Sequence, residues 1–345
     1  MKNFTLNQLL AFFICLLFLW GCNSDDDMGN TPSTGLEKDR YGLVVNEGGF
    51  QQANATLGLI DLDERTFRDS FFIETANAPL GDIFQSIYIE GNIAYLVVNN
   101  SGTIEVVDLS TADHLGTISG LSSPRYLEIS GSTAYATNLF ENHLQKIDLS
   151  TFEVTAEIPF PGWSEQLIWL EDQLFVSCIN CEHAYLIDPV TAEVTDSVFT
   201  GPNAGYIKQL NNNDIVVVST GSFDGTVSPS ITLINSDLEI LDSKYLSAPN
   251  FYGAVDIDLD RNTLYFADES VHSVSISGSE IGDPQIFIDP AGKSIYKITS
   301  DPGGYLYLTN ARDFSSQGEI LVYDHSGNFI YALEAGILPS TVYFY

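Results

Sequence analysis

Two cysteines near the middle of the chain are close enough in sequence to react together or to share a ligand. Residues 178–183 read CINCEH. Covalent haem attachment requires a histidine directly after the second cysteine, and Glu182 stands there instead. Tetrahedral zinc requires four ligands, and the segment offers Cys178, Cys181 and His183 without an evident fourth. We therefore expect a disulfide between Cys178 and Cys181, the usual state of such a pair in an exported protein.

The other metal-ligand residue types do not converge in a recognisable pattern. His143, His183 and His272 each lie four residues before the end of a different repeat, described below, so we expect structural roles for them. Residues 256–262 (DIDLDRN) begin with the acid spacing of a calcium loop, but the glycine at its sixth position and the glutamate at its twelfth are missing. We place this acid-rich segment in a turn between two strands. No catalytic triad, phosphate loop or nicotinamide fingerprint stands out, and we expect no metal and no cofactor.

Three segments rich in glycine and polar residues each carry one phenylalanine, namely Phe50, Phe223 and Phe314. The segments expected to connect one repeat to the next add further aromatic residues, namely Trp163, Tyr206, Phe251, Tyr252 and Tyr296. Aromatic walls with amides and a few charges form pockets for large, partly planar ligands. The alternative is that each phenylalanine folds back and anchors its own loop. The first interpretation predicts a ligand-binding set: Phe50, Gln51, Asn54, Phe223, Asp224, Tyr252, Tyr296, Arg312 and Phe314.

These segments interrupt seven copies of a β-rich pattern. A copy ends in a branched apolar residue followed by aspartate, as in residues 59–62 (LIDL), 106–109 (VVDL), 146–149 (KIDL) and 186–189 (LIDP). Weaker copies end at Ile234, Ile276 and Tyr323. The spacing of the copies is 40 to 47 residues, and turn signals divide each copy into four strands. Units of this length with four strands are typical of propeller blades, so we predict an all-β, seven-bladed β-propeller.

The two ends of the folded part are incomplete in complementary ways. Tyr41 begins directly in a second strand, and residues 340–345 (STVYFY) form a first strand with nothing after it. We expect the C-terminal strand to complete blade 1, because this closes the ring and removes an exposed sheet edge. Almost no helix is expected in residues 40–345.

The longest loops fall in three of the blades. The turn between the second and third strands has nine residues between Asn46 and Thr56, ten between Ser219 and Ser230, and eight between Asn310 and Glu319. The other four blades have three to five residues there. This turn lies on the same face as the connections between blades, where insertions usually build a site. Blades 1, 5 and 7 therefore carry long loops, and each of these loops holds one of the three phenylalanines.

The N-terminus has the features of an export signal. Leu9 to Trp20 form an apolar run of twelve residues, too short to span a membrane and typical of a signal-peptide core. Residues 19–22 (LWGC) resemble a lipobox, which predicts a signal peptide over residues 1–21 and lipidation of Cys22. The acids at 25–27 resemble an export signal to the outer face of the outer membrane, with a plain acidic linker as the alternative. Residues 22–39 are interpreted as an acidic flexible tether and 40–345 as the propeller.

The chain is strongly acidic, which excludes one class of partner. It has 13 basic and 46 acidic residues, a formal net charge of −33. Nucleic-acid binding needs clustered lysine and arginine, so this class is set aside. The surface also repels anionic membranes, and membrane attachment is expected only through the N-terminal lipid.

Part of the sequence is similar to a known family. Residues 45–50 (VNEGGF), 54–57 (NATL), 79–86 (PLGDIFQS) and 99–108 (NNSGTIEVVD) resemble the opening of the YncE-like propeller lipoproteins of the cell surface. The resemblance is specific in blades 1 and 2 and only architectural from blade 3 onward. That family includes cobalamin-capturing proteins that sit over TonB-dependent transporters of the outer membrane. The resemblance implies the fold and an outer-membrane, surface-exposed location, and it transfers no binding residue.

Two classes of function stay open. A nutrient-capture protein would use an aromatic bowl to bind cobalamin or a ferric siderophore and would have a TonB-dependent receptor as partner. An adhesin or interaction scaffold would use the acidic rim to bind another macromolecule. An enzyme of the propeller lyase or lactonase type ranks third, because no convergent acid–base or metal set is visible, and a non-enzymatic binding protein is expected.

Overall fold

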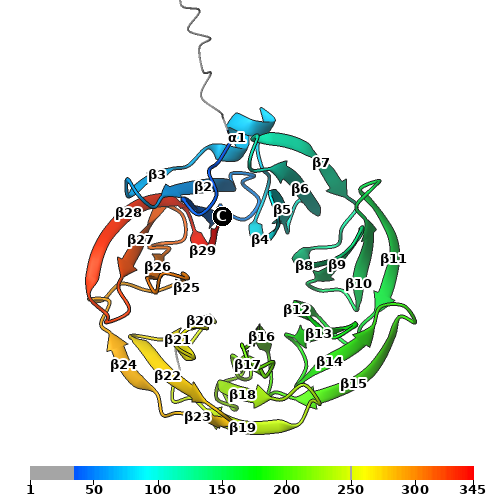
Figure 1. The fold of residues 1–345 in the computed structure, drawn as a ribbon, viewed down its shortest axis with the longest axis vertical. Coiled ribbons are helices and arrows are strands. Elements are labelled where there is room, and N and C mark those ends of the chain that lie inside the picture. The colour runs from blue at the N-terminus through cyan, green and yellow to red at the C-terminus, as the bar shows by residue number, and fades with distance from the viewer. Residues whose placement is uncertain (1–34, 249–250) are drawn as a thin grey trace, which may run out of the picture. The chain divides into compact units, whose positions relative to one another are not determined.

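Each repeat forms a small antiparallel sheet, and the seven sheets stand in a ring in the computed structural model (Figure 1). The structure describes residues 35–248 and 251–345. The predicted signal peptide (1–21), the predicted lipidation site Cys22 and the acids at 25–27 lie outside the described residues. The seven-bladed propeller predicted from the repeats is confirmed.

The first four blades each contain four strands, which we name in order from the inner to the outer edge. Blade 1 consists of β29 (Pro339–Phe344), β1 (Tyr41–Asn46), β2 (Thr56–Asp61) and β3 (Thr66–Arg68). Blade 2 consists of β4 (Phe84–Glu90), β5 (Ile93–Val98), β6 (Thr103–Asp108) and β7 (Asp113–Ser119). Blade 3 consists of β8 (Pro124–Ser130), β9 (Thr133–Asn138), β10 (His143–Asp148) and β11 (Glu153–Pro159). Blade 4 consists of β12 (Ser164–Leu170), β13 (Gln173–Cys178), β14 (His183–Asp188) and β15 (Glu193–Phe199).

The last three blades follow the same order, with one variation. Blade 5 consists of β16 (Ala204–Gln209), β17 (Ile215–Ser219), β18 (Ser230–Ile234) and β19 (Ile240–Tyr245). Blade 6 consists of β20 (Ala254–Asp258), β21 (Thr263–Ala267), β22 (Val271–Ser277), β23 (Glu280–Ile281) and β24 (Gln285–Ile288). Blade 7 consists of β25 (Lys297–Ser300), β26 (Leu306–Asn310), β27 (Gln317–Tyr323) and β28 (Phe329–Ile337). In blade 6 the outer strand is divided, because β23 and β24 pair with different parts of β22.

The C-terminal strand closes the ring as predicted. β29 pairs antiparallel with β1 in the register Leu43↔Tyr343 and Val44↔Val342. The N–H of Tyr345 then donates to the carbonyl of Tyr41 at 3.0 Å. Blade 1 therefore combines the two ends of the described chain in one sheet, and its inner edge is not left unpaired.

Apolar packing between blades explains why the second strands are almost continuously hydrophobic. Seven core clusters occur, one at each junction between neighbouring blades. In β1, Leu43 and Val45 pack toward blade 2, while Val44 packs toward blade 7. A strand covered on both faces has no solvent-facing positions, so the alternation of apolar and polar residues disappears.

The aspartate that ends each repeat has a local structural role. The carboxylate of Asp61 accepts the N–H groups of Asp63 and Glu64, and that of Asp188 accepts those of Val190 and Thr191. Asn235 makes similar contacts in blade 5. A side chain that satisfies backbone donors a few residues later stabilises a tight turn, here the turn from the third to the fourth strand.

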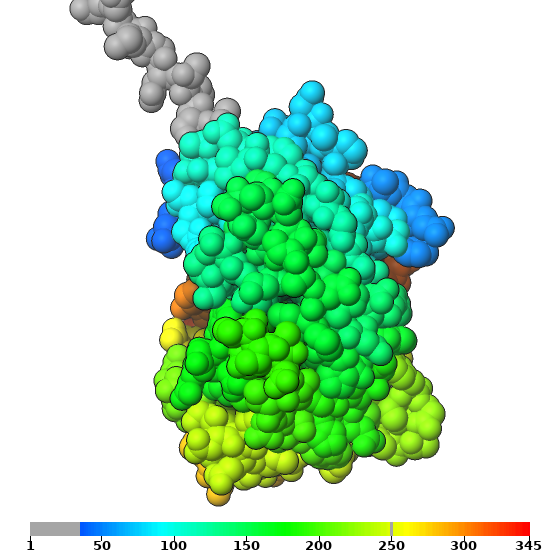
Figure 2. All heavy atoms as spheres, turned by 90° about the vertical axis from the view of Figure 1, so that its right-hand side faces the viewer, coloured from blue at the N-terminus to red at the C-terminus, as the bar shows by residue number. Residues whose placement is uncertain are grey.

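The two faces of the ring differ in the length of their connections. We call the face formed by the second-to-third strand turns and by the connections between blades the loop face. The predicted loops at 47–55 and 220–229 have the expected bounds, and the third loop ends two residues earlier than expected because β27 begins at Gln317. When the ring is viewed edge-on, a yellow-green lobe in the colour of the loop at 220–229 projects from one side (Figure 2).

Both described chain ends lie on the face opposite the loop face. The N–H of Leu36 donates to the carbonyl of Leu109, at the turn from the third to the fourth strand of blade 2. Leu36 is buried in the core cluster between blades 1 and 2, so part of the segment interpreted as a tether packs on the propeller. The hydroxyl of Tyr345 donates to Asn92 in a first-to-second strand turn on this same face.

One short helix departs from an otherwise all-β structure. α1 (Phe71–Ala76) lies in the connection from blade 1 to blade 2, where Phe71 and Phe72 are buried in the core between these blades. Among the described residues, no helix combines the length and the hydropathy needed to cross a membrane.

Candidate functional site

Five exposed aromatic side chains lie in connections on the loop face, and we call them the aromatic rim. Four lie in second-to-third strand turns of blades 1, 3, 5 and 7, and the fifth lies in the connection from blade 5 to blade 6. Their exposed fractions range from 55% for Phe314 to 83% for Tyr252. The rim consists of Phe50, Phe140, Phe223, Tyr252 and Phe314. Large apolar groups held in solvent cost free energy, so a group of them on one face marks an interaction surface.

Phe140 belongs to this rim although the sequence did not single it out. Its ring packs edge-to-face on Trp163 at 5.0 Å. The cysteine hairpin in turn holds Trp163, because the backbone N–H of Trp163 donates to the side-chain oxygen of Asn180 at 2.6 Å. The structure joins Cys178 to Cys181 by a disulfide, and a side chain at Gly162 would lie 2.5 Å from the sulfur of Cys181. The hairpin therefore fixes an aromatic pair at the rim.

Phe314 also has an aromatic neighbour, whereas Phe50 and Phe223 project alone. The rings of Phe314 and Tyr296 meet edge-to-face at 5.9 Å. The hydroxyl of Tyr296 donates to the carboxylate of Glu47 at 3.0 and 3.1 Å, and burial raises the pKa of this tyrosine. Within the described ranges, neither Phe50 nor Phe223 contacts another ring. The folding-back alternative therefore does not describe these two side chains, which are 66% and 79% exposed.

The polar members of the predicted set hold their own loops. Asn54 accepts the N–H of Gly49 at 2.8 Å, and the N–H of Gln51 donates to Asp82 at 2.9 Å. The carboxylate of Asp224 accepts the hydroxyls of Ser222 and Thr226, which lowers the pKa of Asp224 to about 2. These contacts keep the loops in shape and so serve the rim indirectly.

Arg312 is occupied in the same way. Its guanidinium donates to Glu334 at 3.0 Å and to the carbonyl of Gln317 at 3.1 Å. These hydrogen bonds tie the turn that carries Phe314 to the outer strand β28. Of the nine residues predicted for ligand binding, four aromatic ones are exposed on the loop face, Tyr296 is partly buried against Glu47, and the polar ones mainly support the backbone.

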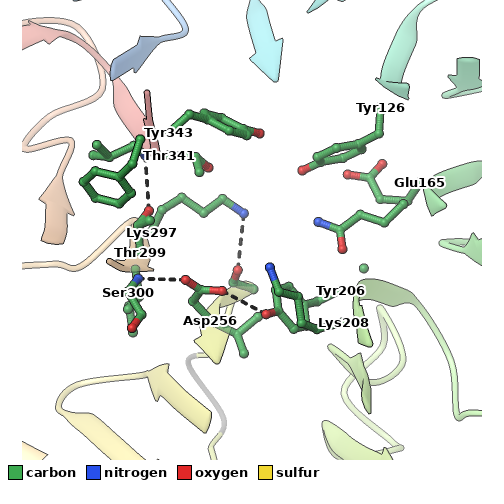
Figure 3. A pocket seen from close by; sticks show the side chains of 17 residues that line it. Tyr126, Glu165, Tyr206, Lys208, Asp256, Lys297, Thr299, Ser300, Thr341 and Tyr343 are labelled. Atoms are coloured by element: carbon green, nitrogen blue, oxygen red, sulfur yellow. Dashed lines mark hydrogen bonds between the residues drawn. The ribbon is translucent and has the colours of Figure 1, made fainter. Parts of the chain in front are cut away.

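Below the rim, the inner strands enclose a polar channel. An upper cavity of about 210 Å³ is lined by Arg125, Glu165, Tyr206, Phe251, Tyr252 and Lys297, among others. A middle cavity of about 270 Å³ shares Glu165, Tyr206 and Lys297 with it, and the side chains that line it point from several inner strands toward a common centre (Figure 3). Tyr252 thus links the aromatic rim to the channel wall.

A buried ion pair crosses the channel wall between blades 3 and 4. The Arg125 guanidinium donates two hydrogen bonds to the Glu165 carboxylate, from Nε at 2.7 Å and from Nη2 at 2.6 Å. Its third nitrogen donates to Gln85 of blade 2. Glu165 is only 5% exposed, and a planar two-bond contact is the strongest arrangement available to such a pair.

The other charges in the channel come from blades 5, 6 and 7. The carboxylate of Asp256 accepts the Tyr206 hydroxyl at 2.9 Å and the Ser300 N–H at 2.7 Å. Burial raises the pKa of Asp256 and lowers the pKa of Lys297. Lys208 and Lys297 both extend their ammonium groups into the open middle of the channel (Figure 3).

Sequence reasoning misplaced two of these residues and missed the others. Asp256 was expected in an acid-rich turn, but it lies within the inner strand β20 and points into the channel, because the turn begins only after Asp258. Tyr206 was expected in a connection and lies within β16. A signal for the channel exists in the sequence, since Gln85, Arg125 and Glu165 are each 40 residues apart, at equivalent positions of three inner strands.

The histidines occupy the positions predicted for them. His143 and His183 begin the third strands β10 and β14, and His272 is the second residue of β22. They belong to blades 3, 4 and 6. Among the residues that the structure describes, no cluster of three histidine, cysteine, aspartate or glutamate side chains has the geometry of a metal site.

Comparison with known proteins supports the fold. No protein-family model matches the chain. No curated protein matches it in sequence. Similar solved structures include a quinoprotein alcohol dehydrogenase-like protein of Bacteroides thetaiotaomicron, with a TM-score of 0.70 and 16% identity over 89% of this chain and 78% of that one. A protein of Desulfotomaculum acetoxidans has a TM-score of 0.67 and 13% identity, over 88% and 98% of the two chains.

A third similar structure is a candidate 6-phosphogluconolactonase of Bacteroides fragilis. It has a TM-score of 0.63 and 11% identity, over 88% of this chain and 98% of that one. At such identities the likeness establishes the propeller architecture. Function has to be argued from the residues of the site, because one fold serves many activities.

Proposed function

We propose that this protein is a non-enzymatic capture protein that binds a bulky, partly planar nutrient on the aromatic rim, with cobalamin as the first choice and a ferric siderophore as the second. The observation that carries the proposal is that five exposed aromatic side chains lie in connections on the loop face, one of which, Tyr252, also lines the upper cavity of the channel. A corrin ring has a broad flat body with amide edges. Stacking surfaces such as Phe223 and Tyr252 suit the body, and backbone and side-chain amides of the loops suit the edges.

The proposal includes a location at the cell surface. We infer that residues 1–21 are removed, that Cys22 carries the lipid, and that the acids at 25–27 direct the protein to the outer face of the outer membrane. The sequence of blades 1 and 2, which resembles YncE-like surface lipoproteins, favours this placement. Leu36 joins the propeller on the face opposite the loop face, which leaves the rim accessible in a protein anchored through its N-terminus. A TonB-dependent transporter is the partner that this arrangement would serve.

The same rim would also suit a protein partner, which keeps the adhesin or scaffold alternative open. Exposed aromatics and a net charge of −33 fit a cationic protein surface as well as a small ligand. Enzymatic names among the similar structures belong to those proteins, whose identity to this chain is 11% to 16%.

The test is a titration of the protein lacking residues 1–22, which retains the described compact unit. Cyanocobalamin, haemin and a ferric catecholate siderophore are each added while heat and ligand absorbance are recorded. The proposal predicts saturable one-to-one binding of cyanocobalamin. If the siderophore binds but cyanocobalamin does not, the captured nutrient is a ferric siderophore instead of cobalamin. No binding of any of the three at high micromolar concentration rejects nutrient capture in favour of a macromolecular partner.

A further inference from the structure

The middle cavity of the channel has a composition unlike the rest of this acidic molecule. Only 13 of the 345 residues are lysine or arginine, yet Lys208 and Lys297 both line this cavity of about 270 Å³. Moving an ammonium group out of bulk water is costly unless it gains a partner. Both ammonium groups therefore need polar or charged neighbours, and the wall of this cavity also holds the carboxylates of Glu165 and Asp256.

The acids of the channel already have hydrogen-bond donors. Glu165 is held by Arg125, Asp256 by the Tyr206 hydroxyl and the Ser300 N–H, and Glu47 by the Tyr296 hydroxyl. None of these three acids depends on direct contact with a lysine for its hydrogen bonds.

The two lysines make no direct ion pair. The Lys297 ammonium donates to the carbonyl of Gly253 at 3.2 Å, and it lies 5.8 Å from the centre of the Tyr296 ring. Among the described residues, no carboxylate oxygen lies within 4.0 Å of either ammonium nitrogen. An ammonium group has three N–H donors, and the described part of the chain accepts one hydrogen bond from Lys297 and none from the ammonium of Lys208.

We propose that the middle of the channel binds a small hydroxylated carboxylate, whose anionic group is held by Lys208 and Lys297. Hydroxyl and amide groups of Tyr126, Gln166, Thr341 and Tyr343 line the same cavity and suit the hydroxyls of such a ligand. Glu165 and Asp256 are also in the wall and oppose a second negative charge, which favours a monocarboxylate over a phosphate. The volume equals roughly nine water molecules at about 30 Å³ each, which suits a short sugar acid.

The shape of the channel indicates how such a ligand enters. The middle cavity opens into the upper cavity through a shared wall that includes Glu165 and Lys297. At its other end it adjoins a cavity that Lys208 also lines, but there Asp258, Asp260 and Asp301 outnumber this single cation and repel an anion. The ligand therefore enters from the loop face.

The burial of Lys297 is a secondary argument for a carboxylate site in the middle cavity. Burial lowers the pKa of Lys297, and an anion beside this ammonium would act in the opposite direction and raise that pKa. This site goes beyond the capture of a bulky nutrient at the rim, because it lies deeper, uses charge instead of stacking, and accepts a much smaller molecule.

The experiment measures binding of glucuronate, gluconate and glycerate to the protein lacking residues 1–22, by calorimetry at constant ionic strength. Glucose serves as the uncharged control ligand. We expect at least one of the three acids to bind with a Kd of about 1 mM or below, and glucose to bind at least about tenfold more weakly. Lys297→Met and Lys208→Met should each weaken the acid by about tenfold or more, because each removes a charged hydrogen bond.

A matched control and a rim variant make the outcome decisive. Lys244 lies on β19, the outer strand of blade 5, and pairs with Asp283. Lys244→Met should leave the affinity for the acid unchanged. Phe223→Ser, at the rim, should also leave acid binding unchanged even if it abolishes binding of a bulky nutrient. The inference is overturned if none of the three acids binds more tightly than glucose, or if the two channel variants bind them as well as the unaltered protein does. Melting temperatures equal to or above that of the unaltered protein would exclude misfolding as the cause of any loss.

Discussion

Arg125 shows how a single side chain can serve the stability of three blades at once. It pairs with Glu165 of blade 4 and bonds to Gln85 of blade 2, while its own backbone belongs to blade 3. A buried ion pair gains little over a well-packed apolar pair, but removal of one partner leaves an isolated buried charge. Removal of one partner should therefore lower the free energy of unfolding strongly, whereas replacement of both partners by apolar side chains should lower it little.

We expect Arg125→Met to destabilise the protein by about 3 to 5 kcal/mol, because Glu165 then stays buried without its cation. The double variant Arg125→Met with Glu165→Leu should recover most of this loss. Thermal unfolding followed by circular dichroism measures both. Arg68→Met is the control, since its pair with Glu74 is half exposed and should contribute within about 1 kcal/mol. A double variant that melts as low as the single one would contradict this role of the pair.

Glu128 of β8 makes the stability depend on pH. Burial raises the pKa of its carboxyl from 4.5 to about 7, and Tyr88 lies close enough for its own pKa to be raised by burial and by this charge. A carboxyl with a raised pKa in the folded state binds protons that the unfolded chain has already released between pH 4.5 and 7. Its contribution is therefore most favourable below pH 4.5 and is lost as the pH rises through 7.

Glu128→Gln should remove this dependence, because glutamine does not ionise. At pH 8 the variant should be more stable than the unaltered protein by on the order of 2 kcal/mol, and at pH 4.5 the advantage should vanish. Melting temperatures across this range give the comparison, with the exposed Glu193→Gln as control. An advantage of the same size at both pH values would refute the role of ionisation.

At the scale of strands and blades, β29 is the element on which the ring depends. It supplies the inner strand of blade 1, and its pairing with β1 joins residues from the two ends of the described chain. Val342 and Tyr345 are buried, and Phe344 packs on Tyr307 of blade 7 at 5.2 Å. Deletion of residues 341–345 should therefore expose a sheet edge and remove buried apolar area worth a few kcal/mol per large side chain.

The expected result is an insoluble protein or one with a much lower melting temperature. A circular permutant that joins Tyr345 to Leu36 by a short linker and opens the loop at 220–229 keeps both the strand and the buried Leu36, and it should retain the melting temperature. Light scattering and thermal unfolding distinguish the two variants. A soluble truncation with an unchanged melting temperature would disprove closure by β29.

The same elements show what could be read from the sequence. The seven repeats, the incomplete ends and the long loops were visible, because an aspartate caps the turn after the third strand in five of the seven blades and therefore recurs at a fixed place. The aromatic loop residues were visible as exceptions to glycine-rich polar segments. The ion pair of Arg125 with Glu165 was not, because each partner lies in a different repeat and only the 40-residue spacing connects them.

The channel escaped sequence reasoning for a related reason. Inner strands are neither fully apolar nor alternating, since one edge faces the axis while both faces pack on neighbouring blades. Asp256 looked like part of an acid-rich turn because Asp258 and Asp260 follow it at the same spacing. Only the position of the strand end, set by the pairing Asp258↔Thr263, separates a channel residue from turn residues.

For the molecule as a whole, the two faces have different tasks. The loop face carries the aromatic rim and the mouth of the channel, and the opposite face carries the described chain ends. A protein anchored through the N-terminal lipid would then be free to present the rim to ligand. A net charge of −33 keeps its surface away from anionic lipid headgroups.

Anchoring and surface exposure can be tested separately. Cys22→Ala should release the protein from the membrane fraction, because the acyl chains are then missing. Replacement of the acids at 25–27 by alanine should keep the protein in that fraction but hide it from protease added to intact cells. Immunoblots of fractions and of protease-treated cells give the readout. If protease still removes the alanine variant from intact cells, these acids are only a linker.

The most direct test of ligand capture at the rim is the dissociation constant of cyanocobalamin for a rim variant. Phe223→Ser combined with Tyr252→Ser removes two of the most exposed rim side chains. The matched control combines Phe329→Ser with Tyr305→Ser, two exposed aromatics outside the loop face. We predict that the rim variant binds at least about thirtyfold more weakly, since one central aromatic contributes on the order of 2 kcal/mol, while the control binds as the unaltered protein does. Equal affinity of the rim variant and the unaltered protein, or an equal loss in the control, would contradict ligand capture by the aromatic rim.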